Sequence, residues 1–424
     1  MSIFRNAYEV LSDACYIWRE ELKQVFRDEG VLIFFILVPL AYPLLYSWIY
    51  NNETVREVPV CVVDDSHSSL SRKFIHRCNA SPDVRILSYA QDLDEARSLV
   101  SRQVVKGIYF IPSDFETNIC RMEPATISVY CDMSLMLAYK AVFQTAQVVS
   151  MQMGSEITSK LGDHYTARDA AISARPLDYE EVALFNPSGG YGSSVLPAVL
   201  MLILQQTLAL GIGLSAGTAR ERNRYGQLIP VNRHYHHTLP IVWGKALCYL
   251  MIYAVMGAWL TCAVPRLFHF PQLATWTTLF ALMLPYTLAC IFFGMVVSCM
   301  VKYRENVMLL MVFISVPLLF MTGVSWPQAS IPGMWQGVSW LFPSTFGVRA
   351  YIRLNTMGAT LSDIAFEYHI LWLHVLVYYL LACAVYRFQI YRARQDVRHR
   401  LAAIKARRSV IAADRGGKPS GPQE

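Results

Sequence analysis

Charged residues are scarce in this sequence. Asp, Glu, Lys and Arg make up only 16% of the 424 residues, whereas a soluble globular domain usually has about 25%. Apolar residues account for 54% of the chain, and the mean hydropathy is +0.32. This composition excludes an ordinary soluble domain and indicates a membrane protein.

Motifs for common catalytic sites are also missing. The chain has no GxxxxGK[ST] sequence, and therefore no P-loop for nucleotide phosphates, and it has neither HExxH nor GxSxG. His234, His236 and His237 lie together, but no Cys, Asp or Glu accompanies them in their loop, and zinc usually needs three or four protein ligands. Asp64 and Asp65 follow a predicted strand, where the run beginning at Asp65 is expected to cap a helix. We therefore assign no catalytic residue and no metal site to this chain.

Long apolar runs are abundant. Six stretches of roughly 20 residues have the length needed to cross the hydrocarbon core of a bilayer. They lie near residues 31–50, 194–216, 239–264, 273–300, 307–325 and 369–390. Lys245 is the main charge within them, and its long stem is expected to carry the ammonium back to the interface.

The first of these runs is predicted to stay in the membrane. About thirty residues precede it, and they include Glu21 and Asp28, whereas a secretion signal has a short basic lead and a shorter apolar core.

Lys and Arg are concentrated in three segments between and after the spans. These are the loop at 217–238, the turn at 302–304 and the tail after the last span. Because short cytoplasmic loops carry an excess of Lys and Arg, this bias places both termini in the cytoplasm and the long stretch 51–190 outside. The formal net charge of +6 is attributed to this bias, and no nucleic acid is expected as a partner.

Residues 3–26 are predicted to form an amphipathic helix. Apolar side chains recur there every three or four residues, which places them on one face. They are Phe4, Tyr8, Leu11, Cys15, Trp18, Leu22 and Phe26. A helix of this kind is expected to lie in the membrane interface, and the alternative is a soluble helix that packs on a partner protein.

Residues 58–131 show a different pattern, in which strands alternate with helices. The predicted strands are "VPVCVVDD", "DVRIL", "VKGIYFIP" and "ATISVYCD". Such alternation predicts an α/β fold with a mainly parallel sheet. Four cysteines lie here, at positions 61, 78, 120 and 131, and the sequence leaves open whether they form disulfides.

The expected fold is an α-helical membrane protein with six transmembrane helices and an external α/β domain inserted between helices 1 and 2. Its predicted parts are a cytoplasmic amphipathic interfacial helix (1–30), transmembrane helix 1 (31–50), a periplasmic α/β domain (51–190), transmembrane helices 2–6 (191–391) and a basic cytoplasmic tail (392–424).

The segment after the fifth span is apolar but repeatedly interrupted by Pro and Gly. An apolar stretch that is too short to span favours a re-entrant or interfacial element, here near 324–347, and Trp side chains suit the headgroup boundary. A kink or local unwinding is expected at the proline inside the fifth span. We predict an outer gate formed by Pro317, Gly323, Trp326, Pro327, Trp335 and Pro343. The alternative is a surface loop without a transport function.

Three segments keep a defined order relative to the six spans. They are "FNPSGGYGSSVLPAVL" before the second span, "TARERNRYGQLIP" after it, and "TGVSWPQASIPGMWQGVSWLFPSTFGVRA" after the fifth. Together they resemble the ABC-2 type permeases, the membrane subunits of a class of bacterial ABC exporters. The strand pattern that begins "VCVVDDSHSSLSRKF" resembles the drug-exporter-like branch of that family, which has a large first external loop.

The resemblance implies a permease in the bacterial inner membrane that moves an amphipathic, drug-like or lipid-like solute outward. It implies ABC ATPase subunits as partners, which would hold ATP and magnesium, and a second permease copy or a paralogue. In this chain no cofactor is expected. The loop that would couple to the ATPase contains Arg220, Glu221, Arg222 and Arg224, although a loop that only sets orientation is the alternative.

Membrane lipids are a further expected partner. Arg349 and Arg353 follow the interrupted segment and are candidates for contact with anionic head groups, with ordinary interfacial anchoring as the alternative. Two other functions remain open at this point: an energy-independent receptor or scaffold that acts through its external domain, and a lipid-modifying membrane enzyme. The enzyme ranks last, because it needs clustered ionisable residues that the spans almost entirely lack.

Overall fold

The computed structural model describes residues 2–51, 54–121, 123–161, 184–186, 190–222, 228, 235, 237–300 and 303–416. The chain divides into two compact units. The helical unit comprises Met1–Asn51, Phe185–Pro187 and Tyr191–Glu424, and the α/β unit comprises Asn52–Leu184 and Ser188–Gly190.

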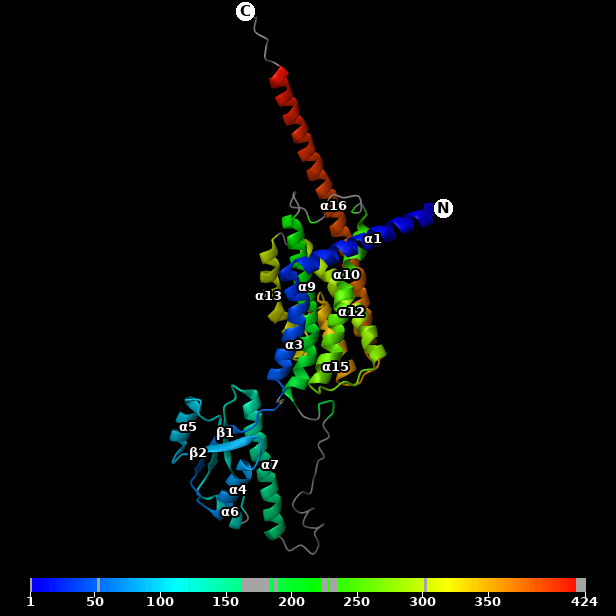
Figure 1. Ribbon diagram of the computed structural model, residues 1–424. Helices are drawn as coiled ribbons and strands as arrows, with labels where there is room; N and C mark the ends of the chain where they lie inside the picture. Colours follow the sequence, from blue (N-terminus) through cyan, green and yellow to red (C-terminus); the bar gives the residue numbers. More distant parts are fainter. Residues whose placement is uncertain are drawn as a thin grey trace, which may run out of the picture. The chain divides into compact units, whose positions relative to one another are not determined.

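Six helical stretches in the helical unit are long and apolar enough to cross a membrane, which confirms the number expected from the sequence (Figure 1). The first is built from α2 (Glu29–Leu32), the π-helical turn η1 (Ile33–Leu37) and α3 (Val38–Ile49). The second is α9 (Tyr191–Arg222), and the third combines α10 (Thr238–Ala258), η3 (Trp259–Ala263) and α11 (Val264–Leu267). The others are α12 (Trp276–Met300), α13 (Arg304–Met321) and the first part of α16 (Ala365–Gly416).

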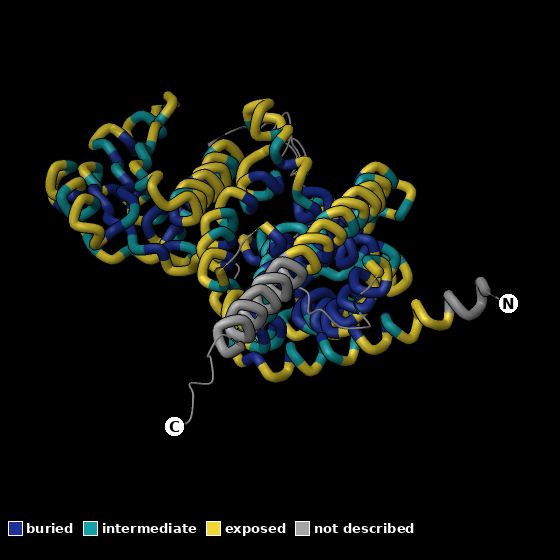
Figure 2. The backbone as a smooth tube through the Cα atoms, turned by 90° about the horizontal axis from the view of Figure 1, so that it is seen from above, coloured by how far each residue is buried: buried dark blue, intermediate teal, exposed yellow. Residues whose placement is uncertain are grey.

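Helix α9 is the most buried of the six, with 72% of its most apolar window buried. Gly211 of α9 faces the ring of Phe35, and a Cβ at this glycine would lie 2.1 Å from the ring. Gly294 of α12 likewise faces the backbone of α9 at Ala209. Small residues let helix backbones approach closely in a membrane, where van der Waals packing rather than water exclusion drives association. Buried residues therefore gather along the middle of the helical unit, while the outward faces stay exposed (Figure 2).

Three shorter elements follow α13. They are the 3-10 turn η4 (Gln328–Ser330), α14 (Gly333–Ser339) and α15 (Pro343–Asn355). Pro343 is the first residue of α15, where its missing N–H leaves no helical hydrogen bond unmade. Gly347 of α15 packs against the ring of Tyr286 in α12, so α15 is part of the core.

The α/β unit contains one four-stranded sheet in the order β2-β1-β3-β4. The strands are β1 (Val58–Asp64), β2 (Val84–Tyr89), β3 (Gly107–Ile111) and β4 (Ser128–Cys131), close to the four predicted stretches. β1 pairs in parallel with β2 and β3, whereas β3 and β4 are antiparallel. The expectation of a mainly parallel sheet is therefore confirmed, with an antiparallel edge strand added.

Helices cover both faces of this sheet. Strand residues such as Val60, Val62 and Tyr109 pack in one core with α4 (Ser69–Asn79), α6 (Phe115–Cys120) and α7 (Met136–Leu161). Their neighbours Cys61 and Val63 face a second core with α5 (Leu93–Ser101). This alternation follows from the two-residue period of a strand.

Two details of the α/β unit answer questions that the sequence raised. All ten cysteines of the chain are free thiols, so no disulfide forms. The prediction that a helix opens at Asp65 is wrong: α4 begins at Ser69, and Ser68 is its N-cap. Asp64 delays the helix because its carboxylate accepts hydrogen bonds from the backbone N–H groups of Ser66 and His67.

Candidate functional site

Helix α1 (Ser2–Arg27) runs across one end of the helical unit (Figure 1). The face that it turns to the other helices carries Ala14, Ile17, Glu21 and Val25, all of which are buried. The predicted apolar stripe overlaps this face only in part: Tyr8 is 74% exposed and Leu11 65%, whereas Trp18 and Leu22 are partly buried against the core. An exposed apolar face on a helix that leads into a membrane span suits the membrane interface.

Glu21 is the polar residue on the packed face of α1, and three side chains surround its carboxylate. The ammonium of Lys245 in α10 lies 2.5 Å from Oε2. Ser215 of α9 donates its hydroxyl to Oε1 at 3.0 Å, and the Tyr249 hydroxyl of α10 donates to the same oxygen. The site therefore joins α1 to both helices that flank the predicted coupling loop.

The arrangement overturns the expectation that Lys245 reaches the interface. Its side chain is only 7% exposed and that of Glu21 only 4%, because α1 covers this position. Gly244 makes the cover possible, since a Cβ there would lie 2.8 Å from the carbonyl oxygen of Ala14. A buried carboxylate, not solvent, compensates the lysine charge.

Burial alone would raise the pKa of Glu21, since the charged form loses its water. The nearby Lys245 charge and the hydrogen bonds from Lys245, Tyr249 and Ser215 act in the opposite direction, and the net result is a lowered pKa. Glu21 is therefore ionised at neutral pH, as an ion pair with Lys245 requires.

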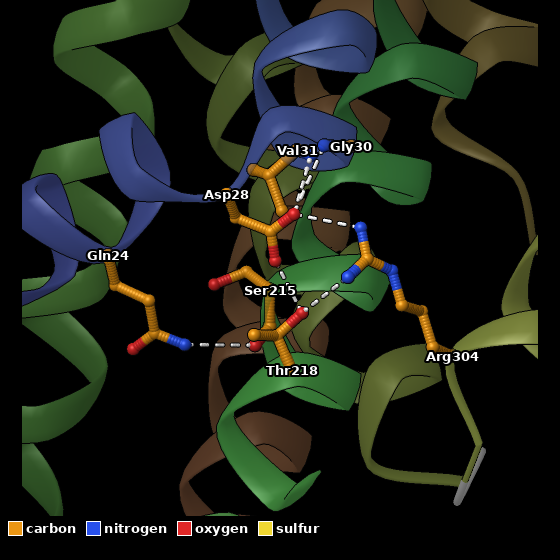
Figure 3. A network of polar contacts seen from close by, with 7 residues as sticks. All are labelled: Gln24, Asp28, Gly30, Val31, Ser215, Thr218 and Arg304. Carbon is orange, nitrogen blue, oxygen red and sulfur yellow. Dashed lines mark hydrogen bonds and ion pairs between the residues drawn. The ribbon is translucent and has the colours of Figure 1, made fainter. Parts of the chain in front are cut away.

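A second carboxylate, Asp28, stands where the chain passes from α1 into the first span (Figure 3). It is the N-cap of α2, and Oδ1 accepts from the backbone N–H groups of Gly30 at 3.1 Å and Val31 at 3.3 Å. Its side chain is 4% exposed. Two donors from other helices complete its contacts.

These donors are Arg304, at the start of α13, and Thr218 of α9. Arg304 Nη2 lies 2.8 Å from Asp28 Oδ1, and the Thr218 hydroxyl donates to Oδ2 at 2.5 Å. Arg304 Nη1 also donates to Thr218 Oγ1 at 3.2 Å, so the three side chains form a closed network (Figure 3). A Cβ at Gly30 would lie 2.1 Å from Arg304 Nη2, so glycine provides the room for this guanidinium.

The Asp28 carboxylate is also held in its charged form. Burial raises its pKa, but the Thr218 hydrogen bond, the Arg304 charge and the remaining hydrogen bonds outweigh this effect and lower it. Between the two carboxylates, Gln24 donates to the carbonyl oxygen of Ser215 at 3.2 Å (Figure 3). We call Glu21, Asp28 and their partners Ser215, Thr218, Lys245, Tyr249 and Arg304 the α1 clamp.

Three of the predicted coupling residues, Arg220, Glu221 and Arg222, lie at the end of α9. Arg220 turns inward, where Nη2 donates to the carbonyl oxygen of Cys299 near the end of α12 at 3.1 Å. Glu221 is exposed. Arg222 is the last residue of α9, and Arg224 lies outside the described residues, as do His234 and His236.

The predicted outer-gate residues lie on α13 and the elements that follow it. Of the predicted kink or local unwinding at Pro317, the unwinding is wrong, because α13 remains helical to Met321, and the kink stays a prediction. One missing donor removes one hydrogen bond, and the neighbouring bonds hold the turn. Gly323 has φ +88°, which is the glycine-favouring conformation that ends a helix. Trp326 and Trp335 are about half exposed, at 56% and 47%.

The interrupted segment satisfies its own backbone groups. Pro327 precedes η4, and Gln336 of α14 donates to the carbonyl oxygens of Gln328 at 3.0 Å and Ile331 at 2.8 Å. Irregular backbone at membrane depth requires such internal partners. The segment thus contains a short helix, α14, between Pro332 and Pro343, and its re-entrant or interfacial placement stays a prediction.

The two arginines proposed for head-group contact are both engaged within the chain. Arg353 pairs with Glu367 at 2.9 Å and donates to the carbonyl oxygen of Asp363 at 2.8 Å. Arg349 donates to the carbonyl oxygen of Thr322 at 3.3 Å. Burial lowers the pKa of Arg349, and the Glu367 charge opposes that effect. These contacts tie α15 to the end of α13 and the start of α16.

Sequence reasoning missed the α1 clamp. Glu21 and Asp28 are seven residues apart, which puts them on one side of the chain, and this side also carries Ile17 and Val25. Acidic residues at that spacing between buried apolar ones are the signal that would have found them. Their basic partners lie more than 200 residues away and follow no local pattern.

The comparisons with known proteins give one finding. The family model described as ABC-2 family transporter protein matches residues 30–384 of the chain. A search of curated proteins gives no match.

Proposed function

The chain belongs to the ABC-2 family of transporter proteins, and from this premise we propose that it is the membrane-spanning permease of an ATP-driven exporter. Separate ABC ATPase subunits bind and hydrolyse ATP with magnesium, since the sequence has no P-loop. The transported solute is amphipathic and either drug-like or lipid-like. The chain acts in the cytoplasmic membrane with both termini inside and the α/β unit in the periplasm.

The α1 clamp is the observation that carries this proposal. Glu21 contacts α9 and α10 through Ser215, Tyr249 and Lys245, and Asp28 contacts α9 and α13 through Thr218 and Arg304. The ends of α9, α10 and α13 are therefore held to the segment that runs from α1 into the first span. A force applied to the loop between α9 and α10 reaches all three spans as well as α1.

In the proposed mechanism, ATP-driven closure of the ATPase subunits pushes on the loop that follows α9. Charged residues at the end of α9 and in that loop, Glu221 among the described ones, meet the partner. Arg220 passes the displacement to α12, because its guanidinium holds the carbonyl oxygen of Cys299. The α1 clamp makes α9, α10 and α13 move together, so that the pathway opens on the opposite side of the membrane.

The exit of the pathway is assigned to the segment from Gly323 to Pro343. Its Trp side chains are exposed at positions 326 and 335, and indole rings favour the membrane interface. The contacts of Arg349 and Arg353 attach this segment to α13 and α16. A second permease copy, or a paralogue, supplies the other half of the pathway.

Two measurements on the full-length chain in native membranes test this function. Affinity purification is expected to bring down an ABC ATPase subunit, and the reconstituted complex is expected to show ATPase activity that an amphipathic solute stimulates. A chain that purifies alone, and reconstituted vesicles without ATP-dependent transport, would contradict the proposal and favour a receptor or scaffold.

A further inference from the structure

A small cavity opens on the surface of the helical unit between two candidate spans. It has a volume of about 110 Å³ and lies between α10 with η3 on one side and α12 on the other. Ala254, Gly257 and Ala258 form one wall, and Leu279, Phe280 and Met283 form the other. The polar atoms of the chain contribute little to its lining, so an apolar ligand fits it.

The cavity exists because small residues, Ala254, Gly257 and Ala258, form the middle of its α10 wall. A Cβ at Gly257 would lie 3.2 Å from Met283 Cε, so glycine leaves the width of the cavity free. The π-helical turn η3 continues this wall. Gln272 donates to the carbonyl oxygens of Thr261 at 3.0 Å and Cys262 at 3.4 Å, which stabilises the irregular turn. The wall is thus held open by the fold.

A cation stands at the rim of this cavity. The guanidinium of Arg266 lies 4.3 Å from the ring centroid of Trp276, and the indole of Trp276 lines the cavity. Arg266 is exposed and, within the part of the chain that the structure describes, forms no salt bridge. The connection 264–275 contains no Asp or Glu. Ring stacking uses the face of a guanidinium and leaves its N–H edge available for an anion.

We propose that this cavity is a binding site for an anionic phospholipid, with part of one acyl chain between α10 and α12 and the phosphate on Arg266. Phe280 is 69% exposed and Trp276 51% exposed, so the site opens toward the surrounding hydrocarbon of a membrane. An indole beside a cation is suited to the depth of the lipid phosphate. The lipid belongs to the outer leaflet, which rests on the orientation in the proposed function.

The site differs from the proposed transport pathway. Its residues belong to α10, η3, α11 and α12, whereas the pathway exit is assigned to residues 323–343. The bound lipid is therefore a resident ligand that fills a gap between two spans, not the exported solute.

Native mass spectrometry of the full-length chain in detergent tests this inference. Phosphatidylglycerol and phosphatidylcholine with the same acyl chains are added separately, and the wild-type chain is expected to bind phosphatidylglycerol more tightly. Arg266→Gln should weaken phosphatidylglycerol binding by about tenfold, as for the loss of one charge-assisted contact, and phosphatidylcholine binding by less, because its choline cation already offsets the charge of the same phosphate. Ala254→Trp fills the cavity and should abolish binding of both lipids.

Val255→Trp is the matched control, because Val255 is the next residue of α10, is 66% exposed and does not line the cavity. It should bind both lipids like the wild type. Equal binding of the two lipids by the wild type, or an unchanged preference in Arg266→Gln, would overturn the proposal. If Ala254→Trp fails to fold, Arg266→Gln still decides, since its side chain is exposed. Co-purification of an ATPase is independent of either result.

Discussion

The ammonium of Lys245 lies 2.5 Å from a carboxylate oxygen of Glu21, although 224 residues of sequence separate the two. Both side chains are less than a tenth exposed. Such a pair loses the hydration of two charges, and attraction repays that loss only when further hydrogen bonds complete the site. Ser215 and Tyr249 supply those bonds to Glu21. The pair therefore contributes more to defining where α1 docks than to net stability.

Removal of one member of the pair should be strongly destabilising. Glu21→Gln leaves the Lys245 charge buried without a counter-charge, and we expect a loss of about 3–5 kcal/mol in the free energy of unfolding. Thermal unfolding in detergent measures it. The double variant Glu21→Leu/Lys245→Met should recover most of the loss, since it leaves no buried charge. Glu20→Gln is the control, because Glu20 pairs with Lys23 at the surface, with the two side chains 39% and 48% exposed, where a pair contributes at most about 1 kcal/mol.

The Asp28 network should make stability sensitive to acid. The pKa of Asp28 is lowered in the folded chain from its ordinary value of 3.8. A lowered carboxyl pKa stabilises the fold above the unfolded value, and this contribution disappears as the pH falls through the folded value. Asp28→Asn keeps the helix cap but loses the charge next to Arg304, so it should be about 2 kcal/mol less stable at neutral pH.

The difference between wild type and Asp28→Asn should stay constant from pH 7 to about 5 and shrink below the ordinary Asp pKa, because the protonated wild type also lacks the charge. Unfolding midpoints of both proteins between pH 7 and pH 3 measure this. A gap that does not change with pH would mean that the cap, not the charge, is what Asp28 provides.

The orientation can be tested by labelling single cysteines in a background without other cysteines. Asp94 has a side chain that is 92% exposed in the α/β unit, and Glu221 is exposed at the end of α9. A membrane-impermeant maleimide should label Asp94→Cys in intact cells and Glu221→Cys only after permeabilisation. Labelling of Glu221→Cys in intact cells would reverse the proposed topology.

Charge reversal at Glu221 should impair coupling without harming the fold. This side chain is exposed, and charge-assisted contacts that become buried in an interface can each contribute about 2–5 kcal/mol. We expect a several-fold fall in solute-stimulated ATPase activity for Glu221→Lys, with unchanged expression. Glu123→Lys makes the same change at an exposed position of the α/β unit and should have no effect. Equal activity in both variants would leave the loop after α9 only a role in setting orientation.

Labelling rates should report movement of the proposed exit. Trp326→Cys and Trp335→Cys replace side chains that are 56% and 47% exposed, whereas a cysteine at Gly323 would strain the backbone at φ +88°. Trapping the complex with vanadate should change the reactivity of both cysteines toward a maleimide, and Asp94→Cys should react at one rate in both states. Identical rates at positions 326 and 335 in resting and trapped complexes would place the exit elsewhere.

Much of the secondary structure was predictable because its signals are local. The span near 273–300 is recognised by its length and lack of charge, and it corresponds to α12. The run "VPVCVVDD" was predicted as a strand from its β-branched residues, and it forms β1. Hydropathy and strand propensity act within a few neighbouring residues, so they can be recognised without knowledge of the rest of the chain.

Errors arose where a side chain depends on a distant one. Lys245 was expected to reach the interface, since a lone lysine in a span has no better option. The apolar stripe that periodicity selects also coincides only in part with the packed face of α1: Tyr8 and Leu11 stay exposed, whereas Trp18 and Leu22 are partly buried against the core. Glu21 decides both cases. Its carboxylate gives Lys245 a buried partner, and Glu21 is itself a polar residue on the packed face of α1.

Composition and periodicity were thus sufficient to predict six apolar helices and a mainly parallel sheet, because the signals for these elements lie within short stretches of sequence. They did not predict which helices contact the carboxylates of Glu21 and Asp28. Asp28 meets Arg304 across 276 residues, and Glu21 meets Ser215 across 194. These contacts require α1 and the start of α2 to lie beside the ends of α9, α10 and α13. Close packing at Gly30 and Gly244 allows this placement, and only the folded chain brings these glycines opposite their neighbours.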